Sequence, residues 1–291
     1  MTAPRVVTLG DIVRLVAGLR AWWLGGAVVG LAIALATGFL MRPVYRAAVV
    51  VMPATGKDLG GGAVAGLLSR FGGDLGIDGA GGQERDEALA VLKSRQFVQQ
   101  FIADENLLPV LFAERWDAEA KAWRDTDPDR VPSAWDGWMR FDRQVRTILE
   151  DRDRALVTIR IEWYDPALAA RWANELVARA NRELRTRRLQ QIEARLQFLQ
   201  AELGRTQLVE LRNAISKVME AQINERMLAN SRPEYAFRVI DPAVAPDVDQ
   251  PERPKRLLLA VLGLVGGALA GLLAALLFRY ARQTPGEAGG A

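Results

Sequence analysis

The chain of 291 residues contains no cysteine and no histidine. Without cysteine it has no disulfide framework and no thiolate nucleophile, although this absence says nothing firm about the redox compartment. Without histidine it lacks the commonest general acid or base and the commonest metal ligand. We therefore expect no metal site, no cofactor and no catalytic residues, since any catalytic site would have to be built from carboxylates.

Charge is absent from two long runs, although 25% of the residues are charged. Residues 21–41 are 21 uncharged positions, and residues 257–278 are 22. A helix of about 20 apolar residues crosses a bilayer core, so both runs are long enough to span a membrane and are poor candidates for buried core helices. A cleaved signal peptide is an alternative for the first run, because Ala34-Leu35-Ala36 resembles a cleavage site. The apolar run continues to Met41, which favours an uncleaved anchor.

Two spans place both chain ends on one side of the membrane. Arginines near these ends favour the cytoplasm: Arg5, Arg14, Arg20, Arg279 and Arg282. Trp22, Trp23 and Tyr280 stand where aromatic rings settle at headgroup level. We expect a cytoplasmic N-terminus (1–20), a first span (21–41), an outward-facing domain (42–256), a second span (257–278) and a cytoplasmic tail (279–291).

Three segments of the connecting domain have the alternation of β-strands. They are Val44–Pro53, the stretch from Val157 to Trp163, and Phe237–Pro242. The first follows one span and the third precedes the other. We therefore expect these two to pair in a small sheet at the membrane-proximal base.

Glycine is unusually dense between Gly56 and Gly82, where 11 of 27 residues are glycine. The context of a phosphate-binding loop is missing, so a mobile loop is expected. The following residues, 84–112, predict a helix ended by Pro109, with these core positions: Leu89, Leu92, Phe97, Val98, Phe101 and Ile102. Residues from there to about 154 are expected to be rich in loops.

Proline is absent and glycine nearly absent from residues 167–230, which predicts a long helix of about 166–230, begun by Asp165-Pro166. Its apolar positions form three seam blocks, and the step between the second and third straddles Gly204, where the helix should shift or bend. The first block is expected to pack on the chain's own sheet: Ala173, Val177, Ala180 and Leu184. The later blocks lack such a partner and are candidates for oligomer contacts: Leu189, Ile192, Leu196, Leu199, Leu203, Leu208, Leu211 and Ile215.

Other clusters give weaker signals. Asp151 and Asp153 alternate with arginines before a strand, which is typical of a solvated turn rather than a carboxylate pair for catalysis. Four tryptophans of the loop-rich region are more typical of core or interface anchors than of sugar contacts: Trp116, Trp123, Trp135 and Trp138. A basic run of the long helix faces solvent, a neighbouring subunit or an anionic glycan: Arg182, Arg185, Arg187 and Arg188. No nucleic-acid partner is expected.

The order of these parts resembles the polysaccharide co-polymerases, the chain-length determinants of O-antigen and related polymers (the Wzz family). The stretches that carry the likeness are "PVYRAAVVV", "EALAVLKSRQFVQQFI", "LLPVLFAERWD", "YDPALAARWANELVARAN", "VELRNAISKVMEAQ" and "EYAFRVIDPAVAP". The family's closing motif, Pro-Lys followed after eleven residues by G-x-x-x-G, falls on Pro254, Lys255, Gly267 and Gly271. Upstream the sequence departs from the family, with Arg253 where serine is usual and with Pro242, Pro246 and Pro251 spaced differently.

The resemblance implies an α+β protein of the bacterial inner membrane. Its periplasmic domains would form a homo-oligomeric ring with long helices rising from an α/β base. It would be a non-enzymatic partner of a membrane polymerase, possessing no fused kinase, that sets glycan chain length and is in contact with lipid and with the growing glycan. Membrane or partner contacts are expected at Gly26, Gly30, Pro251, Pro254, Lys255, Gly263, Gly267 and Gly271, with the glycine stripe of the second span against the first span or the polymerase.

Two other functions stay open. One is a periplasmic adaptor or export subunit of an envelope polysaccharide transporter. Such adaptors usually have two long antiparallel helical arms, whereas this sequence predicts one long helical block. The other is a membrane glycosidase, which would require the carboxylates of "EDRDR" (150–154) to converge on a pocket.

Overall fold

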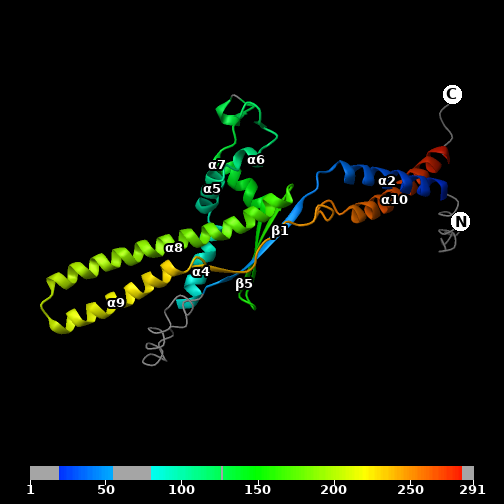
Figure 1. Cartoon of the computed structure of the whole chain (residues 1–291). Helices are drawn as coiled ribbons and strands as arrows, with labels where there is room; N and C mark the ends of the chain where they lie inside the picture. The colour runs from blue at the N-terminus through cyan, green and yellow to red at the C-terminus, as the bar shows by residue number, and fades with distance from the viewer. Residues whose placement is uncertain (1–19, 55–79, 126, 284–291) are drawn as a thin grey trace, which may run out of the picture. The chain divides into compact units, whose positions relative to one another are not determined.

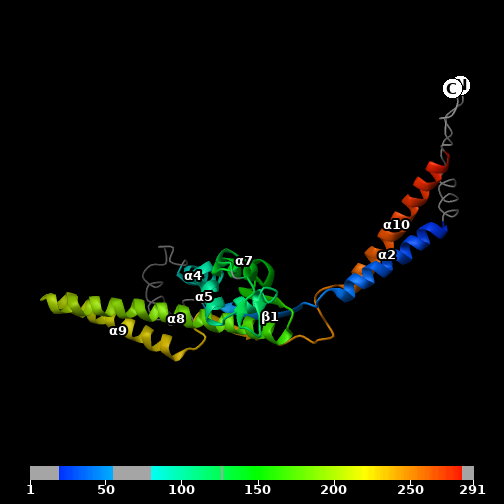
Figure 2. The same ribbon diagram turned by 90° about the horizontal axis from the view of Figure 1, so that it is seen from above.

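The computed structural model describes residues 20–54, 80–125 and 127–283. The chain forms two compact units (Figures 1 and 2). The span unit comprises residues 1–45 and 248–291, and the α/β unit comprises residues 46–247. Arg5, Arg14 and the glycine-rich segment as far as residue 79 lie outside the described residues. The last three residues of the predicted loop belong to a helix, because α4 begins at Ala80.

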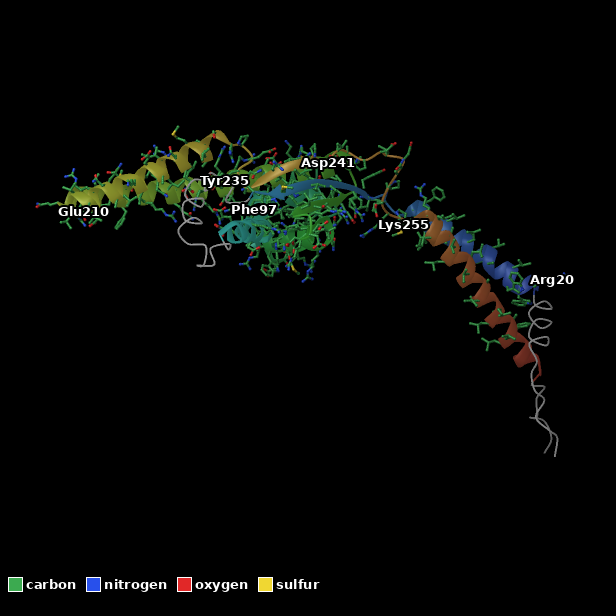
Figure 3. All side chains as sticks on the ribbon, turned by 90° about the horizontal axis from the view of Figure 1, so that it is seen from below. Arg20, Phe97, Glu210, Tyr235, Asp241 and Lys255 are labelled. Atoms are coloured by element: carbon green, nitrogen blue, oxygen red, sulfur yellow. The ribbon has the colours of Figure 1, made fainter. Side chains whose placement is uncertain are left out.

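Two helices make up the span unit: α2 (Arg20–Leu40) and α10 (Arg256–Gln283). They lie side by side and antiparallel, so that Arg20 and Lys255 are at opposite ends of the pair (Figure 3). Both are long and apolar enough to cross a membrane. Only 11% and 6% of their most apolar windows are buried, which is unlike the core helix of a soluble protein.

The α/β unit contains a four-stranded sheet with the order β4-β5-β1-β6. Its strands are β1 (Tyr45–Pro53), β4 (Arg146–Asp151), β5 (Leu156–Trp163) and β6 (Phe237–Asp241). The predicted pairing of the first and third strands is confirmed, because β1 and β6 are antiparallel with Val51 opposite Val239. Strand β5 lies on the other side of β1 and pairs in antiparallel fashion with β4, with Ile159 opposite Ile148.

Strand β4 was not expected, because its sequence does not alternate between apolar and polar residues. Arg146 occupies an inward position, is 5% exposed, and donates to the carbonyl oxygen of Leu92 at 2.6 Å while pairing with Asp142. Leu149 on the same strand is 40% exposed. An inward arginine and an outward leucine reverse the pattern by which strands are recognised.

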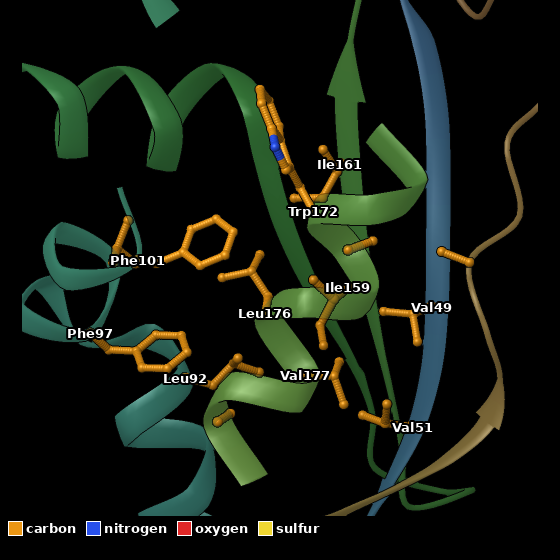
Figure 4. Close-up of a cluster of buried hydrophobic side chains, with 14 of the residues drawn as sticks. Val49, Val51, Leu92, Phe97, Phe101, Ile159, Ile161, Trp172, Leu176 and Val177 are labelled. Atoms are coloured by element: carbon orange, nitrogen blue, oxygen red, sulfur yellow. The ribbon is translucent and has the colours of Figure 1, made fainter. Parts of the chain in front are cut away.

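Helix α8 (Pro166–Arg205) lies between the sheet and helices α4 and α5 (Figure 4). The Asp165 carboxylate caps it by accepting from the backbone N–H groups of Ala167 and Leu168. The first seam block is buried on the chain's own sheet as predicted, at Ala173, Val177, Ala180 and Leu184. Trp172 and Leu176 on the same helix are fully buried beside Ile159 and Ile161 (Figure 4).

The helix predicted for residues 84–112 is three helices: α4 (Ala80–Lys93), α5 (Arg95–Asp104) and α6 (Leu108–Leu111). Ser94 separates the first two, because its side chain accepts from the N–H of Phe97 and starts a new helix. Pro109 lies in the first turn of the short α6 rather than at the end of a helix. Proline is tolerated there because the backbone N–H groups of the first turn have no partner within the helix. The six predicted core positions of this region are all buried.

The region expected to be rich in loops is more ordered than predicted. It contains a two-stranded hairpin of β2 (Trp116–Asp117) and β3 (Ala122–Trp123), a 3-10 turn η3 (Pro128–Arg130), helix α7 (Ala134–Arg140) and a π-helical turn η4 (Phe141–Val145). Short elements of this kind depend on capping groups, which a search for long periodic patterns does not detect. The Asp151–Arg154 stretch is the turn between β4 and β5, as expected.

The long helix is present, but it does not continue to about residue 230. It ends at Arg205, directly after Gly204, and a second helix, α9 (Val209–Ser231), returns along it as an antiparallel hairpin (Figures 1 and 2). The Thr206–Leu208 connection is extended at both ends, with ψ of 136° at Thr206 and 118° at Leu208. The shift expected at Gly204 is therefore a reversal of direction, which lets the later seam blocks face each other. The mixed helix-and-sheet fold class with two candidate spans is confirmed.

Candidate functional site

The glycine stripe of α10 packs on α2. A Cβ atom at Gly26 would lie 2.9 Å from the Cα atom of Gly271 and even closer to the carbonyl oxygen of Gly267. A Cβ at Gly30 would lie 2.8 Å from the Cα atom of Gly267. Real Cβ atoms essentially never come so close to backbone, so only glycine permits this separation of the two helices. The same holds at Gly263, where a Cβ would be 2.6 Å from the carbonyl oxygen of Gly30.

The close contact occupies the whole glycine stripe. Glycines four residues apart on each helix meet backbone to backbone, as in small-residue packing between membrane helices. Ala27 and Ala275 are buried in the same pair, at 8% and 3% exposure. Of the two expected partners of the stripe, the geometry supports the first span, which leaves the outward faces of α2 and α10 for any further protein. Gly25 and Gly266 are on those faces, since a Cβ at either would meet nothing within 4 Å.

The two ends of the span pair are fixed by aromatic contacts. At one end the rings of Trp22 and Phe278 are 5.7 Å apart. At the other end the Arg256 guanidinium lies 4.8 Å from the centre of the Phe39 ring, a cation–π contact. Arg256 thus extends the packing of the pair to the level at which the chain enters α10.

The proline-containing approach to α10 pairs with the segment that leaves α2. Val44 exchanges backbone hydrogen bonds with Arg253 and also accepts from the N–H of Glu252 at 2.9 Å. The hydroxyl of Tyr45 donates to the carbonyl oxygen of Val248 at 3.1 Å. Pro251 and Pro254 flank the bridged residues, and the peptide bond before Pro254 is cis. Lys255 accepts from the N–H of Leu259 and so starts the first turn of α10.

Three of the candidate oligomer residues are instead buried inside the α8–α9 hairpin. Ile192, Leu196 and Ile215 are 0%, 4% and 6% exposed. Ile192 and Leu196 of α8 and Ile215 of α9 are covered within the same chain, which leaves little of these side chains for contact with a neighbouring subunit. Leu189, Leu199 and Leu203 are partly buried on α8.

The hairpin still exposes apolar side chains. Leu208 and Leu211 at its tip are 69% and 43% exposed, and they stay predicted oligomer contacts. A groove of about 450 Å³ runs along one side of the hairpin, lined by Ala194, Arg195, Phe198, Leu199, Val218 and Gln222. Phe198 is 67% exposed, which is unusual for a large aromatic side chain. Apolar side chains on this outer face are therefore left uncovered by the rest of the described chain.

The basic run of α8 is mostly engaged by carboxylates of the same chain. Arg182 pairs with Glu175 at 2.7 Å and Arg187 with Glu183 at 2.8 Å, both on α8. Arg188 reaches across to Glu225 of α9 at 2.5 Å. The Glu225 carboxylate more than compensates for the burial of Arg188, so the pKa of that guanidinium is raised. Arg185 is partly exposed. Contacts within the chain therefore account for three of the four arginines.

Two asparagines of α8, not singled out by sequence reasoning, tie the edge strand to the helix. The side chain of Asn181, 3% exposed, accepts from the N–H groups of Ala236 and Phe237 and donates to the carbonyl oxygen of Phe237. Asn174, seven residues earlier on the same face, makes two such bonds with Ala243. They hold the two ends of β6. The available signal was a pair of asparagines within the first seam block.

The tryptophans of the region after α6 pack on one another. The rings of Trp116 and Trp123 face each other across β2 and β3 at 4.9 Å, and those of Trp135 and Trp138 are 4.9 Å apart on α7. Among the described residues there is no group of three or more acidic side chains placed to hold a metal ion. Asp151 accepts from the N–H of Arg154 in its turn, as a solvated turn residue does. These residues therefore supply packing and turn formation.

Comparisons with known proteins gave the following results. No protein-family profile matches the chain, and no curated protein matches it. Among solved structures it is similar to a full-length bacterial polysaccharide co-polymerase, with 12% identity and a TM-score of 0.42, over 94% of this chain and 99% of that one. It is also similar to a fragment of WzzB, a polysaccharide co-polymerase from Salmonella Typhimurium, with 11% identity and a TM-score of 0.37, over 72% of this chain and 100% of the fragment.

Proposed function

We propose that this protein regulates the chain length of O-antigen or a related surface polysaccharide as a homo-oligomeric scaffold of the bacterial inner membrane. The α/β unit is in the periplasm and both termini are in the cytoplasm. The protein acts through contacts with a membrane polymerase, and with the growing glycan, rather than through catalysis. Chain length then depends on the geometry of the assembly and on how long the polymerase stays in contact.

The observation that carries this proposal is the glycine-packed span pair. The Pro254–Lys255 motif and the glycines that follow it resemble the closing motif of chain-length determinants, and these glycines bring α10 into backbone contact with α2. The outer faces of the pair are free for a polymerase helix, and the exposed side of the α8–α9 hairpin offers an apolar surface to a second copy. Both surfaces suit a protein that works by holding others.

An adaptor of a polysaccharide exporter is the second candidate. The α8–α9 hairpin supplies the two antiparallel helical arms that this function needs. The single long helical block predicted from the sequence is therefore no objection to an adaptor. The arms are short, however. Helix α9 has 23 residues, which gives a length of about 35 Å at 1.5 Å per residue. The carboxylates of the glycosidase alternative lie in a turn and are not favoured.

Complementation of a bacterial strain that lacks its length regulator, read as a glycan ladder on a gel, tests the proposal. The wild-type chain should restore a preferred length, whereas an exporter adaptor would change the amount of surface glycan without changing its length distribution. A ladder that the wild-type chain leaves unaltered, despite normal expression, would overturn the proposed function.

A matched pair of variants then tests the span contact. The double substitution Gly267→Leu and Gly271→Leu forces the helices apart and should broaden or shift the ladder. Gly266→Leu adds the same side chain on the outer face, where a Cβ meets nothing within 4 Å, so it should leave the packing of α10 on α2 intact and separates an effect of that packing from an effect of the outer face. If both variants give the wild-type ladder at normal expression and membrane insertion, the span contact has no part in length control.

A further inference from the structure

A cluster of ionisable side chains joins the root of the α8–α9 hairpin to helix α4. Figure 3 shows Tyr235 at this root and Glu210 at the opposite end of the hairpin. A small cavity of about 50 Å³ at the root is lined by side chains of four segments, among them Glu84 and Glu87 of α4, Arg188 and Gln191 of α8, and Tyr235 before β6. Glu225 of α9 completes the cluster through its ion pair with Arg188.

The hydrogen bonds and the ion pair of the Arg188 guanidinium are made with Glu225 and Gln191 and not with Glu84. Its Nε donates to Glu225 at 2.6 Å and its Nη1 to Gln191 at 3.4 Å, while Nη2 also lies against Glu225. Among the described residues, the Oε2 atom of Glu84 is buried without a hydrogen-bond partner. A second cation that lines the cavity, Arg187, is paired with Glu183. One guanidinium therefore faces three carboxylates, those of Glu84, Glu87 and Glu225.

Protonation of Glu84 would relieve both the unfavourable burial of its unpartnered oxygen and the repulsion among the three carboxylates. A proton on Glu84 removes its repulsion with Glu225 and Glu87 and leaves Arg188 to pair with Glu225 alone. We infer that Glu84 is a proton-operated latch: its protonation tightens the attachment of the hairpin to α4, and its ionisation loosens it.

The direction of the pH effect follows from the electrostatics. Burial, and the nearby carboxylates of Glu225 and Glu87, raise the pKa of Glu84 above its usual 4.5, against the opposing effect of Arg188. When the hairpin root opens, water reaches this carboxyl and its pKa returns toward the usual value. The closed root therefore binds the proton more tightly. Closure is weakest above the raised pKa, strengthens as pH falls through it, and gains nothing further below about pH 4.5, where both forms are protonated.

Tyr235 also faces the cluster. Burial and the surrounding carboxylates raise the pKa of Tyr235 to about 12, so that its hydroxyl stays protonated throughout the range in which Glu84 titrates. The gain in closure at low pH thus comes from Glu84 and not from the tyrosine.

Hydrogen exchange on the full-length protein in nanodiscs tests the latch, because exchange detects rare openings that a mean structure does not show. The readout is exchange of the α9 amides (Val209–Ser231), corrected for intrinsic rate and compared with the α8 segment packed on the sheet. In the wild type, α9 opening should become rarer from pH 8 to pH 5, by up to about tenfold for each pKa unit between the closed and open forms. Glu84→Gln should give the low rate at both pH values.

Glu210→Gln is the matched control, because it removes the same charge at the tip of the hairpin and should keep the wild-type pH dependence. A Glu84→Gln protein that opens like the wild type at pH 8, or a wild type whose α9 opening does not change with pH, would overturn the latch. Because no glycan or polymerase enters this measurement, failure of the latch leaves the proposed function untouched, and the reverse also holds.

Discussion

We predict that replacing Asn181, a single buried side chain that holds the edge strand β6, strongly lowers the stability of the protein. Its carboxamide makes three hydrogen bonds of 2.7–2.8 Å with the backbone at the start of β6, and Phe237 at that point is fully buried. The substitution Asn181→Ala leaves two N–H groups and one carbonyl without their partner. Strand β6 is the edge of the sheet and pairs only with β1, so α8 supplies a large part of what holds it.

The magnitude follows from the number of groups left unpaired. A buried polar group without a partner costs about 1–3 kcal/mol. Some of this cost is recovered where water enters the space left by the carboxamide, so we expect Asn181→Ala to lower the free energy of unfolding by about 3–5 kcal/mol. That is a large part of a typical domain stability of about 5–15 kcal/mol.

Asn174→Ala is the matched control on the same helix. Asn174 is only partly buried and makes two bonds, both with Ala243, so water can replace it and the expected cost is about 1–2 kcal/mol.

Urea unfolding of the full-length protein in detergent, followed by fluorescence, measures both values, since Trp163 and Trp172 report on the core. If Asn181→Ala lowers the free energy of unfolding by no more than Asn174→Ala does, the three hydrogen bonds of Asn181 contribute less to stability than we predict.

Two further predictions concern the hairpin and α7. Ile192→Ala should lower the free energy of unfolding by about 2–5 kcal/mol, because the side chain is fully buried between α8 and α9, whereas Leu208→Ala at the exposed tip should change it by less than about 0.5 kcal/mol; equal costs in urea unfolding would contradict the hairpin packing. Ser133→Ala should destabilise the start of α7 by about 1 kcal/mol at neutral pH, because it removes a reciprocal cap with Asp136. The hydrogen bonds from Ser133 lower the pKa of Asp136 below its usual 3.8, so the cap's contribution is full above that pH and is lost as pH falls through the lowered value. The difference between the acid unfolding curves of the two proteins should therefore shrink at low pH, although the bond from the Asp136 N–H to the Ser133 hydroxyl does not titrate, and a constant difference at all pH values would refute this origin.

Most of the fold could be predicted from the periodicity of the apolar residues and from the length of the uncharged runs. The two uncharged runs became α2 and α10, and two of the predicted strands became β1 and β5. The alternation of apolar and polar residues is clean in β5, whereas both faces of β1 are largely apolar. The six apolar positions of α4 and α5 were placed correctly although the helix breaks at Ser94 between them. A break of one residue leaves the apolar face nearly in phase.

The reversal after Gly204 was harder to foresee. A glycine and a five-residue step between apolar positions fit either a bend in one helix or a turn between two helices. The apolar pattern within each seam block is the same in both cases. What decides is tertiary contact: Ile192, Leu196 and Ile215 can be buried without a second chain only if α9 folds back. The ion pairs Arg188–Glu225 and Arg226–Glu193 join the two helices, but residues more than thirty positions apart leave no periodic mark in the sequence.

The hairpin also changes what a neighbouring subunit has to supply. One continuous helix of about 64 residues would run for roughly 95 Å and expose its later seam blocks, so that the monomer would depend on its neighbours to bury them. In the hairpin the chain buries the inner seam itself, and the outer groove around Phe198 and the tip around Leu208 are left exposed. In the proposed homo-oligomer, association and separation of subunits would then not require either helix to unfold. When the interface of an assembly is separate from the folded core of its subunits, the size or lifetime of the assembly can vary while each subunit stays folded. The proposed control of polymer length by assembly geometry requires this independence.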